Sequence, residues 1–93
     1  MPDYEIVYIV SPEVADGDLN DVINKVGGFA KKVGGNITEV TQWGRKKFTY
    51  PIRKFLEGNY VLTHLEIEPK SVKELDANLQ FASEILRHLI IKL

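Results

Sequence analysis

The fold is decided by residues 60–68, which read YVLTHLEIE. Successive side chains of a β-strand point to opposite faces of the sheet. One face of this segment carries its odd-numbered residues, Val61, Thr63, Leu65 and Ile67. The other face carries its even-numbered residues, Tyr60, Leu62, His64 and Glu66. The alternation predicts a strand with one buried face, and Pro69 ends it.

Three other segments are rich in the β-branched and aromatic residues that favour strands. Residues 4–10 predict the first strand and residues 36–50 predict the second. We expect residues 51–59 to connect the second strand to the third, with Gly58-Asn59 as the turn. Residues 87–93 predict the last strand.

Apolar residues recur at helical spacing in two segments. The first helix is predicted over residues 19–33, with Gly34-Gly35 as its C-cap. Gly27-Gly28 lies inside this helix, where each glycine costs about 1 kcal/mol relative to alanine. Close approach of the helix backbone to the sheet would explain this pair. The second helix is predicted to begin with Ser71 as its N-cap, because Glu74 follows three residues later as in a capping box.

The predicted order of elements is strand, helix, strand, strand, helix, strand. Because strand–helix–strand crossovers are right-handed, the compact solution is a four-stranded antiparallel sheet with both helices on one face. This is the α+β ferredoxin-like βαββαβ sandwich, and we expect residues 1–93 to form a single domain of this kind. The other face of the sheet stays open and should carry Tyr60, Leu62 and His64. An open face with apolar groups is a candidate docking surface, so Leu62 and His64 are predicted to contact a partner protein.

The composition excludes several classes of protein. A chain of 93 residues, of which 44% are hydrophobic, can build one modest core but no deep active-site cavity. The absence of cysteine excludes disulfides, thiol nucleophiles and thiolate metal sites. No segment approaches the roughly 20 apolar residues that span a bilayer, and Asp3 and Glu5 argue against a signal peptide. We therefore expect a soluble cytoplasmic protein.

The charges are distributed unevenly along the chain. The formal net charge is −1, yet residues 40–56 contain five bases and no acid, whereas the rest contains seven bases and thirteen acids. The five bases are Arg45, Lys46, Lys47, Arg53 and Lys54. The same segment contains the aromatic residues Trp43, Phe48 and Tyr50. Aromatic rings can stack on unpaired bases while the cations neutralise phosphates. The alternative is that these bases form an ordinary basic hairpin that is exposed to solvent.

Alternation along the predicted second strand would separate these side chains. It places Arg45 and Lys47 on one face of the strand, and Lys46, Phe48 and Tyr50 on the other. We expect the Phe48 ring to belong to the core.

Neither a metal site nor a catalytic site is indicated. His64 and His88 are the only histidines, and Glu66 is the nearest carboxylate that could join them if the third and fourth strands approach. Two histidines and a carboxylate can bind a metal ion, but the spacing is unspecific, so histidines at the surface or sheet edge are favoured. The candidate serine nucleophiles lie at predicted turns or caps. We therefore expect no enzyme activity and no cofactor.

The basic segment carries a family resemblance. Its motif is a Trp-Gly pair followed by residues at alternate positions, namely Trp43, Gly44, Lys46, Phe48, Tyr50, Ile52 and Lys54. Tyr4-Glu5 at the start, Gly58 and Tyr60 before the third strand, and ILRHLIIK at 85–92 extend the match over the chain. Together these residues resemble the sixth protein of the bacterial small ribosomal subunit. The family often has arginine directly after the initiator methionine, whereas this chain has Pro2-Asp3.

The resemblance implies a structural protein of the small ribosomal subunit. Such a protein binds the central domain of the small-subunit ribosomal RNA together with the eighteenth small-subunit protein. Its cations are predicted to contact phosphates and its tyrosines to contact exposed nucleotides. The predicted RNA contacts are Tyr4, Arg45, Lys46, Lys47, Tyr50, Arg53, Lys54, Tyr60 and Arg87. The alternative is a small oligomeric ligand-binding or regulatory module of the same fold, and the solution mass with and without RNA distinguishes the two.

Overall fold

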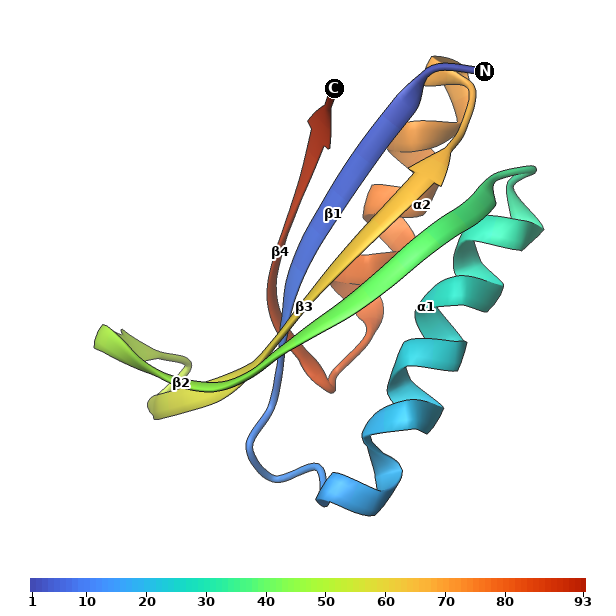
Figure 1. The fold of residues 1–93 in the computed structure, drawn as a ribbon. Helices are drawn as coiled ribbons and strands as arrows, with labels where there is room; N and C mark the ends of the chain where they lie inside the picture. Colours follow the sequence, from blue (N-terminus) through green and yellow to red (C-terminus); the bar gives the residue numbers. More distant parts are fainter.

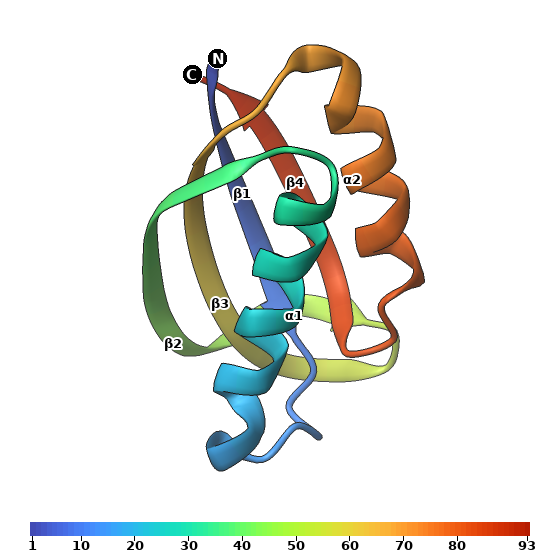
Figure 2. The ribbon, with the colours of Figure 1, turned by 90° about the vertical axis from the view of Figure 1, so that its right-hand side faces the viewer.

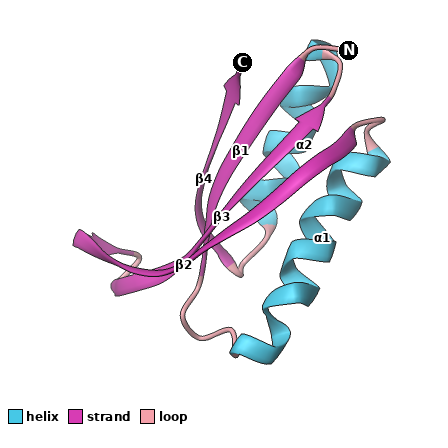
Figure 3. Cartoon of the chain, viewed as in Figure 1, coloured by secondary structure: helices cyan, strands magenta, loops and turns pink.

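The computed structural model describes residues 1–93 as four strands and two α-helices, with one short 3₁₀ helix directly before the first α-helix. The elements are β1 (Asp3–Val10), η1 (Asp16–Asp18), α1 (Leu19–Lys32), β2 (Asn36–Ile52), β3 (Phe55–Glu66), α2 (Pro69–Phe81) and β4 (Ile85–Lys92). The strands form one antiparallel sheet in the order β2-β3-β1-β4. Both helices cover the same face of this sheet (Figures 1 and 3). The predicted ferredoxin-like fold is confirmed.

The core lies between the sheet and the two helices. Ile6 and Tyr8 of β1 are fully buried there against Leu75 and Leu79 of α2 and Val26 of α1. Alternation in β3 is as predicted. The residues on its inward face, Val61, Thr63 and Leu65, are buried, whereas Tyr60, Leu62 and His64 on the open face are half-buried.

Three predicted boundaries are wrong. The second helix begins at Pro69, so Ser71 lies inside its first turn and is not the N-cap. Proline suits the first helical position because its φ angle is already helical and its missing N–H needs no partner there. The third strand ends at Glu66, and the last strand begins at Ile85, two residues earlier than predicted.

The prediction for the connection between β2 and β3 is also wrong. β2 continues to Ile52 and β3 begins at Phe55, so only Arg53-Lys54 forms the turn. Both turn residues have positive φ angles, 48° and 65°. A two-residue hairpin loop can require positive φ at both central positions, which Asn-Gly adopts far more readily than arginine and lysine. The turn is therefore strained, and its residue types do not predict a turn of this kind.

Replacing Arg53-Lys54 by Asn-Gly is expected to raise the free energy of unfolding by about 1 kcal/mol or more, because the left-handed conformation costs ordinary residues about 1–2 kcal/mol each. Urea denaturation of the wild type and the variant measures the difference. An unchanged or lowered stability would show that these two φ angles carry no strain.

Gly27-Gly28 does not serve close packing, contrary to the prediction. A Cβ atom added at either glycine would meet nothing within 4 Å. The pair instead borders a hollow of about 390 Å³ between α1 and β2.

Neither helix combines the length and the apolar composition that a membrane span requires.

Candidate nucleic-acid interface

The hairpin formed by β2 and β3 projects beyond the rest of the sheet. It bends away from the helices, toward the side of the open face (Figure 1), and its tip lies behind the start of β4 in Figure 2. The register between its two strands shifts at several points, including the stretch from Lys47 to Ile52. Such irregularities increase the local bend and twist of a strand pair. The projecting hairpin therefore has a concave side that faces the sheet.

A hollow of about 250 Å³ occupies this concave side, and we call it the hairpin hollow. It is lined by residues of all four strands of the sheet, namely Ile9, Lys47, Phe48, Thr49, Tyr50, Ile52, Tyr60 and Arg87. Strand register accounts for three of them, because Arg87 pairs with Ile9 and Ile9 pairs with Tyr60 across β4, β1 and β3. Five of the eight come from a short stretch of β2. Residues far apart in sequence thus surround one space.

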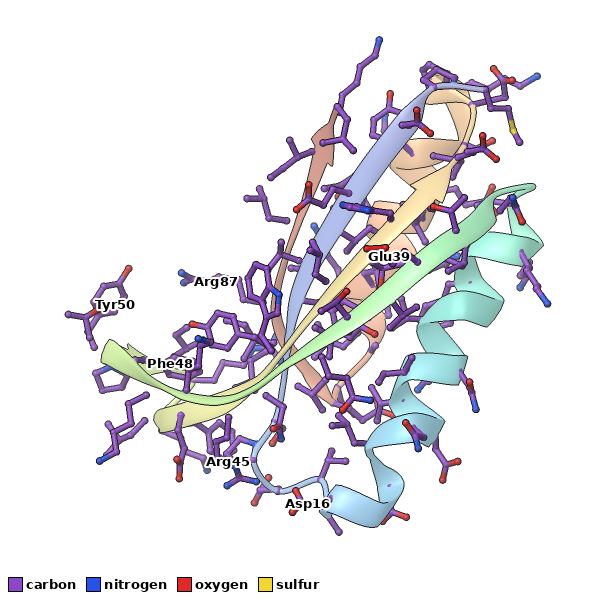
Figure 4. All side chains as sticks on the ribbon, in the orientation of Figure 1. Asp16, Glu39, Arg45, Phe48, Tyr50 and Arg87 are labelled. Carbon is purple, nitrogen blue, oxygen red and sulfur yellow. The ribbon has the colours of Figure 1, made fainter.

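The walls of the hairpin hollow are aromatic. The rings of Phe48 and Tyr60 meet edge to face, with centroids 6.2 Å apart and planes inclined by 60°. Both rings are half-buried, whereas Tyr50 is 64% exposed. The prediction that Phe48 belongs to the core is wrong, because its ring packs on the open side of the sheet, outside the core cluster. Figure 4 shows Phe48, Tyr50 and Arg87 on the same side of the hairpin.

Two free cations border the same hollow. Lys47 and Arg87 are exposed and form no ion pair. The predicted alternation holds as far as Lys47, which pairs with Glu57, the ion-pair partner of Arg45, whereas Phe48 contacts Tyr60 on the open side. The strand register then shifts between Lys47 and Ile52, and Lys47 borders the hollow beside Phe48 and Tyr50. The site therefore combines positive charge with aromatic surface.

Arg53 lies next to this site. It lines a second hollow, of about 370 Å³, together with Gln80 of α2 and Arg87. Arg87 thus lies between the two hollows and links the hairpin turn to the start of β4. Lys46 and Lys54 are exposed on the hairpin and form no ion pair.

Two predicted RNA contacts lie apart from the hairpin hollow. Arg45 is on the other side of the hairpin (Figure 4), where its Nη1 lies 3.7 Å from Glu57 Oε2 and its Nη2 donates to the Pro12 carbonyl. Tyr4 lies at the far end of β1, pairs with Leu65, and is only 8% exposed within the core. The structure brings neither side chain to the concave side.

The open face continues from the hairpin hollow in two rows across the sheet. Leu62, Val7 and Leu89 form an apolar row, in which the Leu89 side chain is 59% exposed. Leu89 could have been found from the alternation in ILRHLIIK, which places it on the same face as Arg87. This apolar row lies on the face of the sheet that no helix covers.

His64 occupies the next row. Its Nε2 lies 3.6 Å from Glu5 Oε2 and its Nδ1 lies 3.7 Å from Glu39 Oε1. The open face therefore changes character along the strands, from cationic at the hairpin, through apolar, to acidic around His64. This polarity follows from strand pairing and is not apparent in the linear sequence.

The geometry rules out a joint metal site of the two histidines. β1 lies between β3 and β4, so His64 and His88 are not on neighbouring strands. They also point to opposite faces, since His88 Nε2 lies 2.6 Å from Asp76 Oδ1 of α2 on the helix side. His88 lies on the edge strand β4, in agreement with the prediction of a surface or edge histidine, and its side chain is 10% exposed. No group of three potential ligands is present.

Comparison with known proteins identifies the family. The model of the family described as ribosomal protein S6 matches residues 3–92. The chain belongs to this family. It is 38% identical over 93 residues to small ribosomal subunit protein bS6 of Alkaliphilus oremlandii, covering 100% of this chain and 98% of that protein. It is 38% identical over 91 residues to the same protein of Clostridioides difficile, covering 98% of each.

Solved structures agree with this assignment. The crystal structure of 30S ribosomal protein S6 from Thermotoga maritima superposes with a TM-score of 0.92 at 27% identity, covering 99% of this chain and 87% of that one. The C-terminal domain of MgtC from Mycobacterium tuberculosis has a TM-score of 0.69 at 10% identity, covering 100% of this chain and 88% of that one, and shares the fold alone. The predicted family and the location on the small subunit of cytoplasmic ribosomes are thereby confirmed.

Proposed function

We propose that this chain is a structural, non-enzymatic component that binds the central domain of the small-subunit ribosomal RNA through the concave side of its hairpin. We propose that residues 1–93 form a single domain. The observation that carries the proposed RNA binding is that Lys47 and Arg87 both border the hairpin hollow, whose walls are aromatic, and that neither forms an ion pair. Lys46, Arg53 and Lys54 extend the cationic surface along the hairpin.

Charge explains how such a surface would bind. Each cation that neutralises a phosphate releases counterions, so affinity falls as salt rises. With about three to five phosphate contacts, log K should fall with log salt with a slope of about −2 to −4. Binding by the isolated protein should then be weak at physiological salt. We propose that Tyr50 and Tyr60, which line the hollow, contact exposed nucleotides. Arg45 and Tyr4 are proposed as contacts only on the sequence pattern.

A second surface would make the binding cooperative. We propose that the eighteenth small-subunit protein covers the apolar row of Leu62, Val7 and Leu89 and reaches His64. The carboxylates of Glu5 and Glu39 beside His64 would favour a basic segment of that partner. Positive coupling between two ligands is typically worth about 1–3 kcal/mol and is reciprocal. The partner should therefore tighten RNA binding by the same factor by which RNA tightens partner binding.

The double variant Lys47→Ala/Arg87→Ala is expected to flatten the salt slope by about 1 for each cation removed. The measurement is binding of a labelled central-domain ribosomal RNA fragment over a salt series, with and without the eighteenth protein. Lys70→Ala/Lys73→Ala removes two exposed lysines from α2 and serves as the matched control, with an unchanged slope.

An unchanged slope in the Lys47→Ala/Arg87→Ala variant would remove the hairpin from the RNA interface. A wild-type protein that forms a tight homodimer and ignores RNA under every condition would instead favour a ligand-binding or regulatory module. Solution mass with and without RNA, measured on the same samples, separates the two results.

A further inference from the structure

The hairpin hollow has a defined size and lining as well as charge. Pockets for drug-sized ligands have volumes of about 300–1,000 Å³, and the hairpin hollow, at about 250 Å³, lies just below that range. Ile9, which is 7% exposed, forms its floor, and the rings of Phe48 and Tyr60 form walls. We propose that the hollow takes one unpaired nucleobase of RNA, while Lys47 and Arg87 hold the phosphates on either side of that nucleotide. This inference rests on the RNA binding proposed above.

The lining favours a base over the backbone of a duplex. Paired bases are stacked inside a helix, so a duplex presents its phosphates and leaves no ring to enter a concave aromatic space. An unpaired base can be splayed out and stacked on aromatic side chains, which changes affinity by about tenfold or more for each base. The exposed ring of Tyr50 lies at the same hollow and adds aromatic surface.

The lining also favours a base over an apolar side chain of a partner protein. An apolar side chain would be satisfied by Ile9, Phe48 and Tyr60 alone and would leave two cations without a counter-charge. A nucleotide supplies both parts, because its ring suits the walls and its phosphates suit Lys47 and Arg87. Charge complementarity therefore selects RNA as the occupant.

The Phe48 ring is held in place before any ligand arrives. It contacts Tyr60 edge to face, and it lies close to the backbone of β3 at Gly58. A Cβ atom at position 58 would lie 3.2 Å from Phe48 Cζ, so glycine leaves room for the ring there. A wall that is already ordered loses little conformational freedom on binding.

The test compares three RNA hairpins at about 50 mM salt, where electrostatic binding is strong. The first carries a single bulged adenosine, the second is fully paired, and the third has an abasic nucleotide at the bulge. The wild-type protein is expected to bind the first about tenfold more tightly than the other two. With 2-aminopurine as the bulged base, binding is expected to change its fluorescence as the base stacks on an aromatic ring.

Phe48→Leu is expected to abolish the tenfold preference without changing the salt slope, since leucine keeps the apolar contact but provides no ring. Phe81→Leu is the matched control, because Phe81 is 88% exposed at the end of α2 and does not line the hollow. Its preference should equal that of the wild type. If Phe48→Leu does not fold, as judged by circular dichroism, Tyr60→Leu takes its place with the same expectation.

Three results would contradict the inference. Equal affinity for the three hairpins, with binding still weakened by Lys47→Ala/Arg87→Ala, would overturn the nucleobase site and leave the proposed RNA binding intact. Loss of binding to the eighteenth protein in Phe48→Leu, with RNA binding unchanged, would assign the hollow to a protein partner. No binding to any RNA, including the central-domain fragment with the partner present, would reject the proposed function itself.

Discussion

The wild-type protein is expected to lose stability above pH 10 because Tyr8 ionises, and Tyr8→Phe is expected to prevent this loss. Tyr8 is fully buried in the middle of β1, and its hydroxyl has no hydrogen-bond partner. Burial raises the pKa of Tyr8 to about 12, and the Thr63 side chain acts in the opposite direction. The folded protein therefore favours the neutral, protonated form of the Tyr8 phenol.

The direction of the pH effect follows from proton binding. The unfolded chain releases this proton near pH 10, whereas the folded chain keeps it until about pH 12. Between these values the unfolded state binds fewer protons, so the free energy of unfolding falls as pH rises. The contribution of Tyr8 is complete below pH 10, and about 1.4 kcal/mol of it should be lost by pH 11.

Urea denaturation at pH 8 and pH 11 measures this effect. The wild type should lose about 1.4 kcal/mol more than Tyr8→Phe over that interval. At pH 8 the variant should be at least as stable as the wild type, because it removes a buried hydroxyl that lacks a partner. Tyr50→Phe, which alters an exposed tyrosine, controls for the loss of one hydroxyl. Parallel losses in the wild type and Tyr8→Phe would show that the Tyr8 phenol ionises without unfolding the protein.

Gly58→Ala is expected to lower the free energy of unfolding by about 1–3 kcal/mol, the usual cost of overpacking. A Cβ atom at this position would lie 2.6 Å from Ile9 Cγ2 and 3.0 Å from the Val10 carbonyl oxygen. The Ile9 side chain can rotate, but the backbone of Val10 is held in the sheet by its pairing with β3. Relief of the clash therefore requires β1 and β3 to shift apart.

Gly27→Ala is the matched control for Gly58→Ala and should have the opposite sign. Gly27 lies inside α1, where an added Cβ atom meets no other atom within 4 Å. Alanine in a helix interior is more favourable than glycine by about 0.5–1 kcal/mol. Thermal or urea denaturation of the two variants gives both values. A neutral Gly58→Ala would mean that the two strands separate at little cost.

Local patterns in the sequence predicted the strands and helices where burial and periodicity agree. The alternation in residues 60–68 correctly placed Val61 and Leu65 inward and Leu62 outward, because a strand with one buried face selects apolar residues at every second position. The motif from Trp43 to Lys54 predicted the family. Neither inference required knowledge of contacts distant in sequence.

The turn of the hairpin shows where local preference fails. Gly58-Asn59 has the composition of a turn, yet both residues lie within β3. Gly58 is needed there because Ile9 and Val10 approach its backbone from β1. The real turn uses Arg53-Lys54, whose conformation is imposed by the pairing of the strands on either side. Contacts between strands outweighed the preferences of individual residues.

The sequence by itself determined the order of the elements, the buried face of the third strand, the polarised charge and the family. The tertiary structure alone decided which of the basic and aromatic residues act together. Arg87 reaches the hairpin because β4 pairs with β1 and β1 with β3, and Lys47 and Phe48 both border the hollow where the strand register shifts. Periodicity reports the neighbours of a residue along its own element, whereas a binding surface depends on strand order and curvature, which arise from packing between distant parts of the chain.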